Sequence, residues 1–150
     1  EVKVQTERPV RGRQRARELL VQALYQWQLT GQQSDDLLEQ FSARTEFLRI
    51  DQTYFRELFS AVLFDLEDLD ALISEHADWD HDQLDTVSRA VLLLSLSELK
   101  TRFEIPAKVV INEAVELAKR YGPTDSFRFI NAVLDSAAKQ VGRGSELGQT

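Results

Sequence analysis

Apolar residues recur every three or four positions along most of the chain, which is the periodicity of amphipathic helices. The first such stretch covers about residues 12–30, with Gly31 as its predicted stop. Its apolar stripe is formed by Ala16, Leu19, Leu20, Ala23, Leu24 and Trp27. No alternating strand pattern competes with these stripes, so the sequence predicts an all-α protein with six or seven helical segments.

Local signals predict the helix boundaries in the next part of the chain. Ser34 is the expected N-cap of a short helix, because serine side chains accept hydrogen bonds from the free N–H groups of a first turn. Asp51 can cap the following helix in the same way, and the apolar pattern of that helix breaks near residues 65–68 before it resumes. The stretch 76–82 is predicted to be an acidic loop.

The most apolar segment, about residues 84–102, is expected to be the central helix of the core. A further helix covers residues 106–121, since proline suits a first turn and Gly-Pro ends the stretch. The last helix should start at Thr124 or Asp125 and run to about residue 141.

A chain of 150 residues suits one compact domain, here about seven helices in two packed helical bundles. Residues 1–12 are predicted to be a flexible arginine-rich arm, which Pro9 and Gly12 keep extended. Residues 13–141 would form the helical domain, and residues 142–150 a frayed polar tail.

The net charge of −7 is unevenly distributed. Residues 1–17 carry six Lys or Arg against two acids, whereas residues 35–85 carry three Arg against fifteen acids. A polyanion responds to the local field, so the basic N-terminal arm is more informative than the acidic total.

The ten-residue stretch 8–17, at the end of the arm and the start of the first helix, contains no acid and five arginines: Arg8, Arg11, Arg13, Arg15 and Arg17. Guanidinium groups bind phosphate with two hydrogen bonds and stack on bases, so the exclusive use of arginine favours RNA. Arg13 and Arg17 are four apart and should share one helical face. A solubilising tail explains the composition about equally well. A membrane-surface role is weaker, because no exposed apolar face accompanies the arginines.

No residues point to an enzyme, a cofactor or a metal ion. The chain has no cysteine, P-loop, dinucleotide fingerprint or nucleophile elbow, and its carboxylates are too dispersed to name a catalytic pair. His76 and His81 flank an acidic run that resembles a calcium loop. However, Gln83 stands where the turn glycine belongs and Arg89 where the bidentate glutamate belongs.

No apolar run approaches the roughly 20 residues of a membrane helix, and residues 1–17 hold no hydrophobic block of a secretory signal. The lack of cysteine agrees with a reducing compartment. We therefore expect a cytoplasmic protein with no membrane role.

Four aromatic residues are candidates for surface contacts. Tyr25 and Trp27 are two positions apart, so one helix cannot bury both on a single face, and Trp27 fits the apolar stripe. Phe127 and Phe129 diverge in the same way, with Arg128 between them. Core packing is the ordinary role of such aromatics. Phe129 beside a basic residue is nevertheless a candidate base-stacking or partner contact.

Three blocks of sequence, in order, resemble the NusB family. Residues 106–122 read PAKVVINEAVELAKRYG, like the signature helix of that family, and residues 129–135 follow with FINAVLD at the expected distance. Residues 15–29 read RARELLVQALYQWQL and are similar to the family's first helix. The resemblance covers about residues 11–140, most strongly at both ends.

The resemblance implies an all-helical RNA-binding factor of transcription antitermination that is not an enzyme. Such a factor binds the single-stranded boxA element of nascent ribosomal RNA transcripts. It acts with NusE, which is also a protein of the small ribosomal subunit, and helps elongating RNA polymerase pass terminators.

By position, the resemblance assigns partner contacts to Tyr25, Ser88 and Phe129, where Ser88 replaces a residue that is often acidic. In the RNA-binding arm, Gln14 stands where arginine is common. The full RNA-binding set carried over in this way is Arg11, Arg13, Gln14, Arg15, Arg17, Tyr25, Arg128 and Phe129.

The central helix departs from the family pattern. Leu93 stands where members often have arginine, and Ser97 where they have an aromatic residue. These changes bear on partner contacts of that helix and not on the fold. Asn112 and Glu113, inside the signature helix, are expected to be a buried hydrogen-bonding pair rather than a ligand site.

Two alternatives remain open. Some RNA cytosine methyltransferases carry a NusB-like N-terminal domain, so the chain could be the RNA-targeting part of an enzyme. It could also be a purely protein-binding helical adaptor whose arginine arm only solubilises it.

Overall fold

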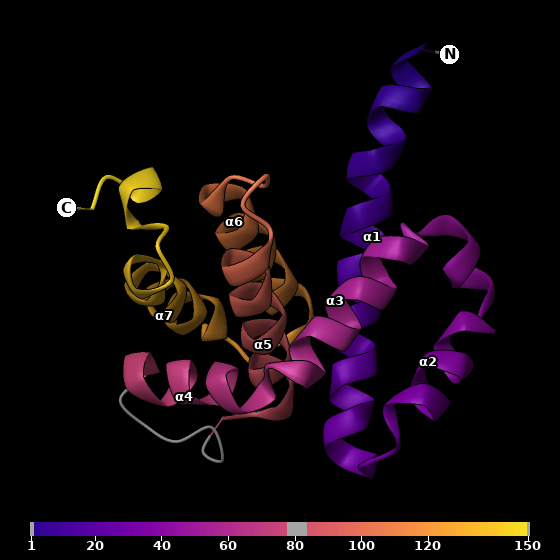
Figure 1. Cartoon of the computed structure of the whole chain (residues 1–150), viewed down its shortest axis with the longest axis horizontal. Coiled ribbons are helices and arrows are strands. Elements are labelled where there is room, and N and C mark those ends of the chain that lie inside the picture. The colour runs from indigo at the N-terminus through magenta and orange to yellow at the C-terminus, as the bar shows by residue number, and fades with distance from the viewer. Residues whose placement is uncertain (1, 78–83, 150) are drawn as a thin grey trace. The chain divides into compact units, whose positions relative to one another are not determined.

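The computed structural model describes residues 2–77 and 84–149, and the side chains from residue 10 onward within those ranges. These residues form seven α-helices and two 3-10 helices without a strand, which confirms the all-α prediction (Figure 1). The chain divides into two compact units, Glu1–Leu63 (unit 1) and Phe64–Thr150 (unit 2).

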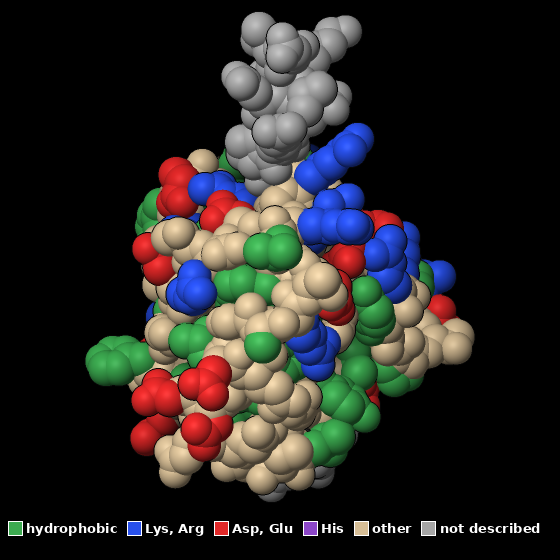
Figure 2. All heavy atoms as spheres, turned by 90° about the vertical axis from the view of Figure 1, so that its right-hand side faces the viewer, with side chains coloured by type: hydrophobic (Ala, Val, Ile, Leu, Met, Phe, Trp, Pro, Cys, Tyr) green, Lys and Arg blue, Asp and Glu red, His purple; other side chains and the backbone are tan. Residues whose placement is uncertain are grey.

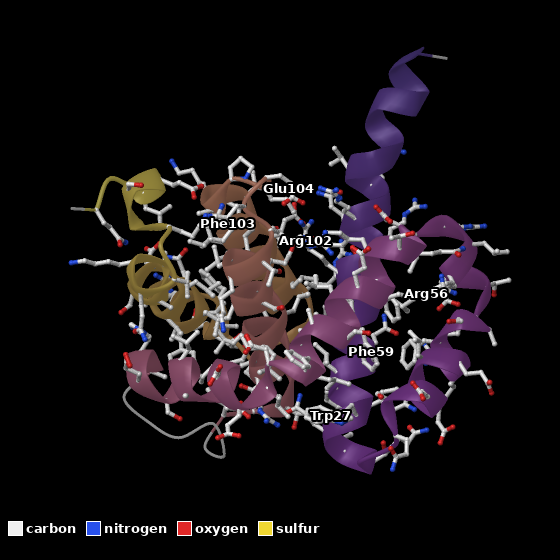
Figure 3. The ribbon with its side chains drawn as sticks, viewed as in Figure 1. Trp27, Arg56, Phe59, Arg102, Phe103 and Glu104 are labelled. Atoms are coloured by element: carbon white, nitrogen blue, oxygen red, sulfur yellow. The ribbon has the colours of Figure 1, made fainter. Side chains whose placement is uncertain are left out.

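Unit 1 is built on the long helix α1 (Val2–Thr30), followed by α2 (Ser34–Ser42), the 3-10 helix η1 (Thr45–Arg49) and most of α3 (Gln52–Phe64). Stacked and edge-on rings join these elements, because Phe55 of α3 lies 6.4 Å from Phe41, 5.4 Å from Phe47 and 6.1 Å from Phe59 between ring centroids. Figure 3 shows Phe59 on the side of α3 that faces α2. The predicted stripe of α1 is buried from Ala16 to Leu24.

The extended backbone predicted before residue 12 is wrong, because α1 begins at Val2 and continues through Pro9 and Gly12. Gly12 instead permits a close approach. The backbone N–H of Asp51 donates to the Gly12 carbonyl at 3.0 Å, and a Cβ at Gly12 would lie 3.3 Å from that nitrogen. The glycine therefore brings the start of α3 against α1.

Unit 2 contains α4 (Leu66–Ala77), α5 (Thr86–Thr101), α6 (Ala107–Tyr121), α7 (Ser126–Gln140) and the 3-10 helix η3 (Gly144–Leu147). Every residue of α5 from Ala90 to Leu99 is buried, which confirms α5 as the central helix. The helices α4, α6 and α7 contact it and cover it. A helix buried on all sides is hydrophobic all round, as the continuous apolar run of α5 predicts.

Most predicted boundaries are confirmed by cap geometry. The Oδ1 atom of Asp51 accepts from the Tyr54 N–H at 3.0 Å, and the chain breaks at Asp65 between α3 and α4. Ser34 is the exception, because Gln33 occupies the N-cap position and Ser34 is already helical. The last helix starts after Asp125, which adopts a left-handed conformation with φ of 66°.

The frayed tail predicted for residues 142–150 is also wrong over the described part. Arg143 has no exposed surface, and η3 follows it directly. Gln149 donates a side-chain hydrogen bond to the Asp135 carbonyl of α7 at 2.9 Å. The tail is thus a packed part of unit 2.

Candidate nucleic-acid interface

The N-terminal half of α1 carries the exposed part of the predicted arginine set. Arg11, Gln14 and Arg15 are exposed there, while Arg8 lies among residues whose side chains are outside the described set. Figure 2 shows several Lys and Arg side chains close together on the upper part of this face, with some acidic side chains among them, and a separate acidic group lower down. A helix of this kind presents cations at fixed positions to a polyanion.

Arg13 and Arg17 share one helical face, as their spacing predicts, but this face packs on α3. Both guanidinium groups lie over the Tyr54 ring, at 4.9 Å for Arg13 and 5.6 Å for Arg17. Arg13 also lies 3.8 Å from a carboxylate oxygen of Asp51. Arg17 is only 4% exposed, which leaves little of it for a phosphate. These two arginines hold α1 on α3 and so position their exposed neighbours.

Tyr25 and Trp27 diverge as the helical geometry requires. Tyr25 is 40% exposed, whereas Trp27, which continues the apolar stripe, is half-buried. Tyr25 therefore presents a ring face and a hydroxyl at the surface, the combination that suits base stacking or a partner contact.

In unit 2, a second basic and aromatic cluster lies where α6 ends and α7 begins. Arg128 is exposed and 3.7 Å from a carboxylate oxygen of Asp125. The centroid of the Phe127 ring lies 5.0 Å from Lys119 Nζ and 5.2 Å from the Arg128 guanidinium. The Phe129 side chain is half-buried and is also engaged in an interaction within the protein. The sequence pattern missed Lys119, because it comes from the preceding helix.

Ser88 is placed differently from the prediction. Its side chain is 1% exposed, and its backbone N–H donates to Asp85 Oδ2 at 2.9 Å to cap α5. Contrary to the partner contact expected there, this side chain offers no surface. Leu93 and Ser97 are buried as well, so the departures of the central helix lie in the core.

The expected buried pair in the signature helix is also corrected. Asn112 is exposed on α6, and only Glu113 is half-buried and engaged in an interaction. An exposed asparagine satisfies its amide with water and needs no buried partner.

His76 lies in the last turn of α4 and not in a loop. Its Nδ1 lies 2.7 Å from Ser136 Oγ and its Nε2 lies 2.7 Å from Gln140 Oε1, both on α7. These bonds occupy both ring nitrogens and tie α4 to α7. Over residues 2–77 and 84–149, no group of three His, Asp or Glu side chains could hold a metal ion. His81 and most of the predicted acidic loop lie outside the described residues.

None of the helices within the described ranges is long and apolar enough to cross a membrane.

Comparisons with known proteins agree on one family. The NusB family model matches residues 14–139. The "Transcription antitermination protein NusB" of Pseudoalteromonas translucida is 44% identical over 129 residues, which cover 86% of this chain and 95% of that protein. The protein of the same name from Baumannia cicadellinicola is 46% identical, over 88% of this chain and 95% of its own. A solved structure of T. maritima NusB superposes with a TM-score of 0.75 at 30% identity, over 90% of this chain and 96% of that chain. The chain belongs to the NusB family.

Proposed function

We propose that this protein is an RNA-binding antitermination factor. Together with NusE, it binds the boxA element of nascent ribosomal RNA transcripts and helps RNA polymerase read through terminators. Relatives that are 44% and 46% identical over most of the chain are named as transcription antitermination proteins. We propose a binding role in the cytoplasm, with no catalytic step and no cofactor.

The observation that carries the proposal is the set of exposed polar side chains on one anchored helix, α1. Arg11, Gln14 and Arg15 are exposed, while Arg13 and Arg17 lie over Tyr54. Because Arg13 and Arg17 hold α1 in place, the helix backbone that carries the exposed side chains is already ordered before RNA binds. Less ordering means a smaller entropic cost of association.

The remaining contacts are proposed on surfaces of both units. Tyr25 would stack on a base or contact NusE, and Arg128 would meet a phosphate beside Phe129. Each of these side chains is exposed or half-exposed in its own unit. Arginine and aromatic side chains are the usual means of holding splayed single-stranded bases.

A titration of fluorescent single-stranded boxA RNA with the full chain tests the proposal. The double variant Arg11→Gln/Arg15→Gln should weaken binding and reduce the slope of log K against log salt by about 1.4, from about 0.7 per lost phosphate contact on single strands. The control is Lys108→Gln/Lys139→Gln, which removes the same charge from exposed positions of unit 2. Equal effects of both double variants would contradict a local RNA site on α1.

A further inference from the structure

Unit 1 has a groove between α1 and η1. It has a volume of about 280 Å³, close to the lower end of small-ligand pockets at about 300 Å³. Its lining residues are Arg15, Glu18, Leu19, Gln22, Glu46, Arg49 and Ile50. Arg15 is thus the only one of them that belongs to the predicted RNA-binding set.

Two arginines face this groove without being engaged by the protein. Arg15 and Arg49 are both exposed, and neither forms a hydrogen bond, ion pair or ring contact with any residue that the structure describes. Other arginines of unit 1 are held: Arg44 lies 4.0 Å from the centroid of the Phe41 ring, and Arg56 lies 4.9 Å from that of Phe47. Two free guanidinium groups beside one groove are suited to a single phosphate, which can accept from both.

The amide of Gln22 supplies a neutral recognition group at the same place. Its Oε1 accepts a hydrogen bond from Arg44 Nη1 at 3.2 Å, which leaves the NH₂ group as a donor. Arg44 is itself fixed over Phe41, so the amide is held by a fixed neighbour. A nucleobase edge carries carbonyl and ring-nitrogen acceptors for such a donor.

The remaining lining residues fit a base better than a run of phosphates. The half-buried Ile50 provides apolar surface for the face of a ring, and the buried Leu19 lies beneath the groove. Glu18 is already engaged in an interaction, while Glu46 is exposed at the edge of the groove. A carboxylate there repels phosphate, so the groove suits one phosphate held by two arginines rather than several.

We propose that this groove binds one nucleotide of single-stranded RNA, with the phosphate on Arg15 and Arg49 and the base edge on Gln22. The inference rests on the proposed function and extends the RNA contacts from α1 to η1. Arg15 belongs to both surfaces, so the RNA strand passes continuously from the arginines of α1 into the groove.

Four variants of the full chain test the groove by titration with the same single-stranded boxA RNA at several salt concentrations. Arg49→Gln should weaken binding several-fold and reduce the salt slope by about 0.7. Gln22→Ala should weaken binding several-fold with an unchanged slope, because the amide is neutral. Glu46→Gln should tighten binding, because it removes a negative charge beside the phosphate. The matched control Arg56→Gln removes one exposed arginine of unit 1 outside the groove and should leave affinity and slope close to the parent values.

The outcomes separate the two proposals. If the parent chain binds boxA RNA but Arg49→Gln behaves like Arg56→Gln, the groove is overturned and the proposed function stands. Binding by Gln22→Ala at the parent affinity also overturns it, since a groove that does not hold the base is not a nucleotide site. If the parent chain does not bind the RNA at all, both proposals fail. Circular dichroism of each variant checks that a weaker complex does not come from unfolding.

Discussion

The buried guanidinium of Arg143 pairs with the carboxylate of Glu146 and binds the loop between α5 and α6. Arg143 donates to the carbonyl of Leu99 at 3.0 Å and to that of Ile105 at 2.5 Å. Glu146 accepts from Arg143 and also from the backbone N–H of Ala107, at 2.8 Å, at the start of α6. The pair therefore satisfies orphan groups at the end of one helix and at the start of the next. Figure 3 shows the loop that this pair fixes, with Phe103 labelled on it.

Arg143→Ala is expected to lower the free energy of unfolding by about 3 kcal/mol, because it leaves the buried carbonyls of Leu99 and Ile105 without their donor. Chemical denaturation measures the change. Lys139→Ala, an exposed substitution on α7, is the control and should stay within about 0.5 kcal/mol. Equal stability of the two variants would show that the tail contributes nothing.

The same pair predicts an acid-dependent stability. The pKa of Glu146 is lowered from 4.5 to about 2, first by the hydrogen bond from Arg143 and second by the N–H of Ala107. A lowered folded-state pKa stabilises the fold fully above the unfolded-state pKa, and this contribution is lost as the pH falls from about 5 to 2. Glu146→Gln should remove this part of the acid dependence in denaturation curves at several pH values. Glu116→Gln, at an exposed carboxylate of α6, should leave it unchanged.

The sequence predicted those features of the fold that depend on near neighbours. The cap at Asp51 and the break at Asp65 follow from residues within one turn. The packed tail does not, because the carbonyls that Arg143 binds lie 38 and 44 residues earlier in the chain. A polar, glycine-containing end gives no local signal of such a contact, and this is why residues 142–150 were predicted to fray.

The candidate site also has some features that the local sequence predicts and others that depend on residues of other helices. Helical geometry alone separates Tyr25 from Trp27, and the structure confirms the separation. The burial of Arg17 depends on Tyr54, a residue of another helix, so the arginine run could not be divided into anchoring and exposed members from sequence. No sequence pattern indicated the groove proposed around Arg49, because a single arginine in an acidic stretch shows no pattern until η1 brings it beside α1.

Arg17 and Arg15 should therefore differ in what they stabilise. Arg17→Ala is expected to lower the free energy of unfolding by about 1 to 2 kcal/mol, because it removes a buried stem and a cation–π contact with Tyr54. Arg15→Ala should change stability by less than about 0.5 kcal/mol and instead weaken RNA binding. Thermal or chemical denaturation of the two variants tests the distinction, and a reversed order of stabilities would contradict it.

Phe129→Asp should reduce RNA binding with little loss of helicity, because Phe129 is half-buried at the start of α7. The change removes a stacking surface and adds a charge that repels phosphate. Val109→Asp makes a similar apolar-to-acid change at an exposed position of α6 and serves as the control. If Phe129→Asp unfolds the protein, Phe129 is a core residue and its assignment to the RNA site is wrong.

The last prediction concerns RNA and NusE together. When NusE contacts both this protein and the RNA, each contact raises the effective concentration of the others, so NusE should tighten boxA binding at least several-fold. Thermodynamic linkage then requires RNA to tighten NusE binding by the same factor. Two titrations measure the two factors, one of RNA with and without NusE and one of NusE with and without RNA. Tyr25→Ala should lower both factors equally if Tyr25 contacts NusE, since its exposed ring lies at the surface of α1. RNA affinity that is the same with and without NusE would contradict the adaptor mechanism, even if the protein binds RNA alone.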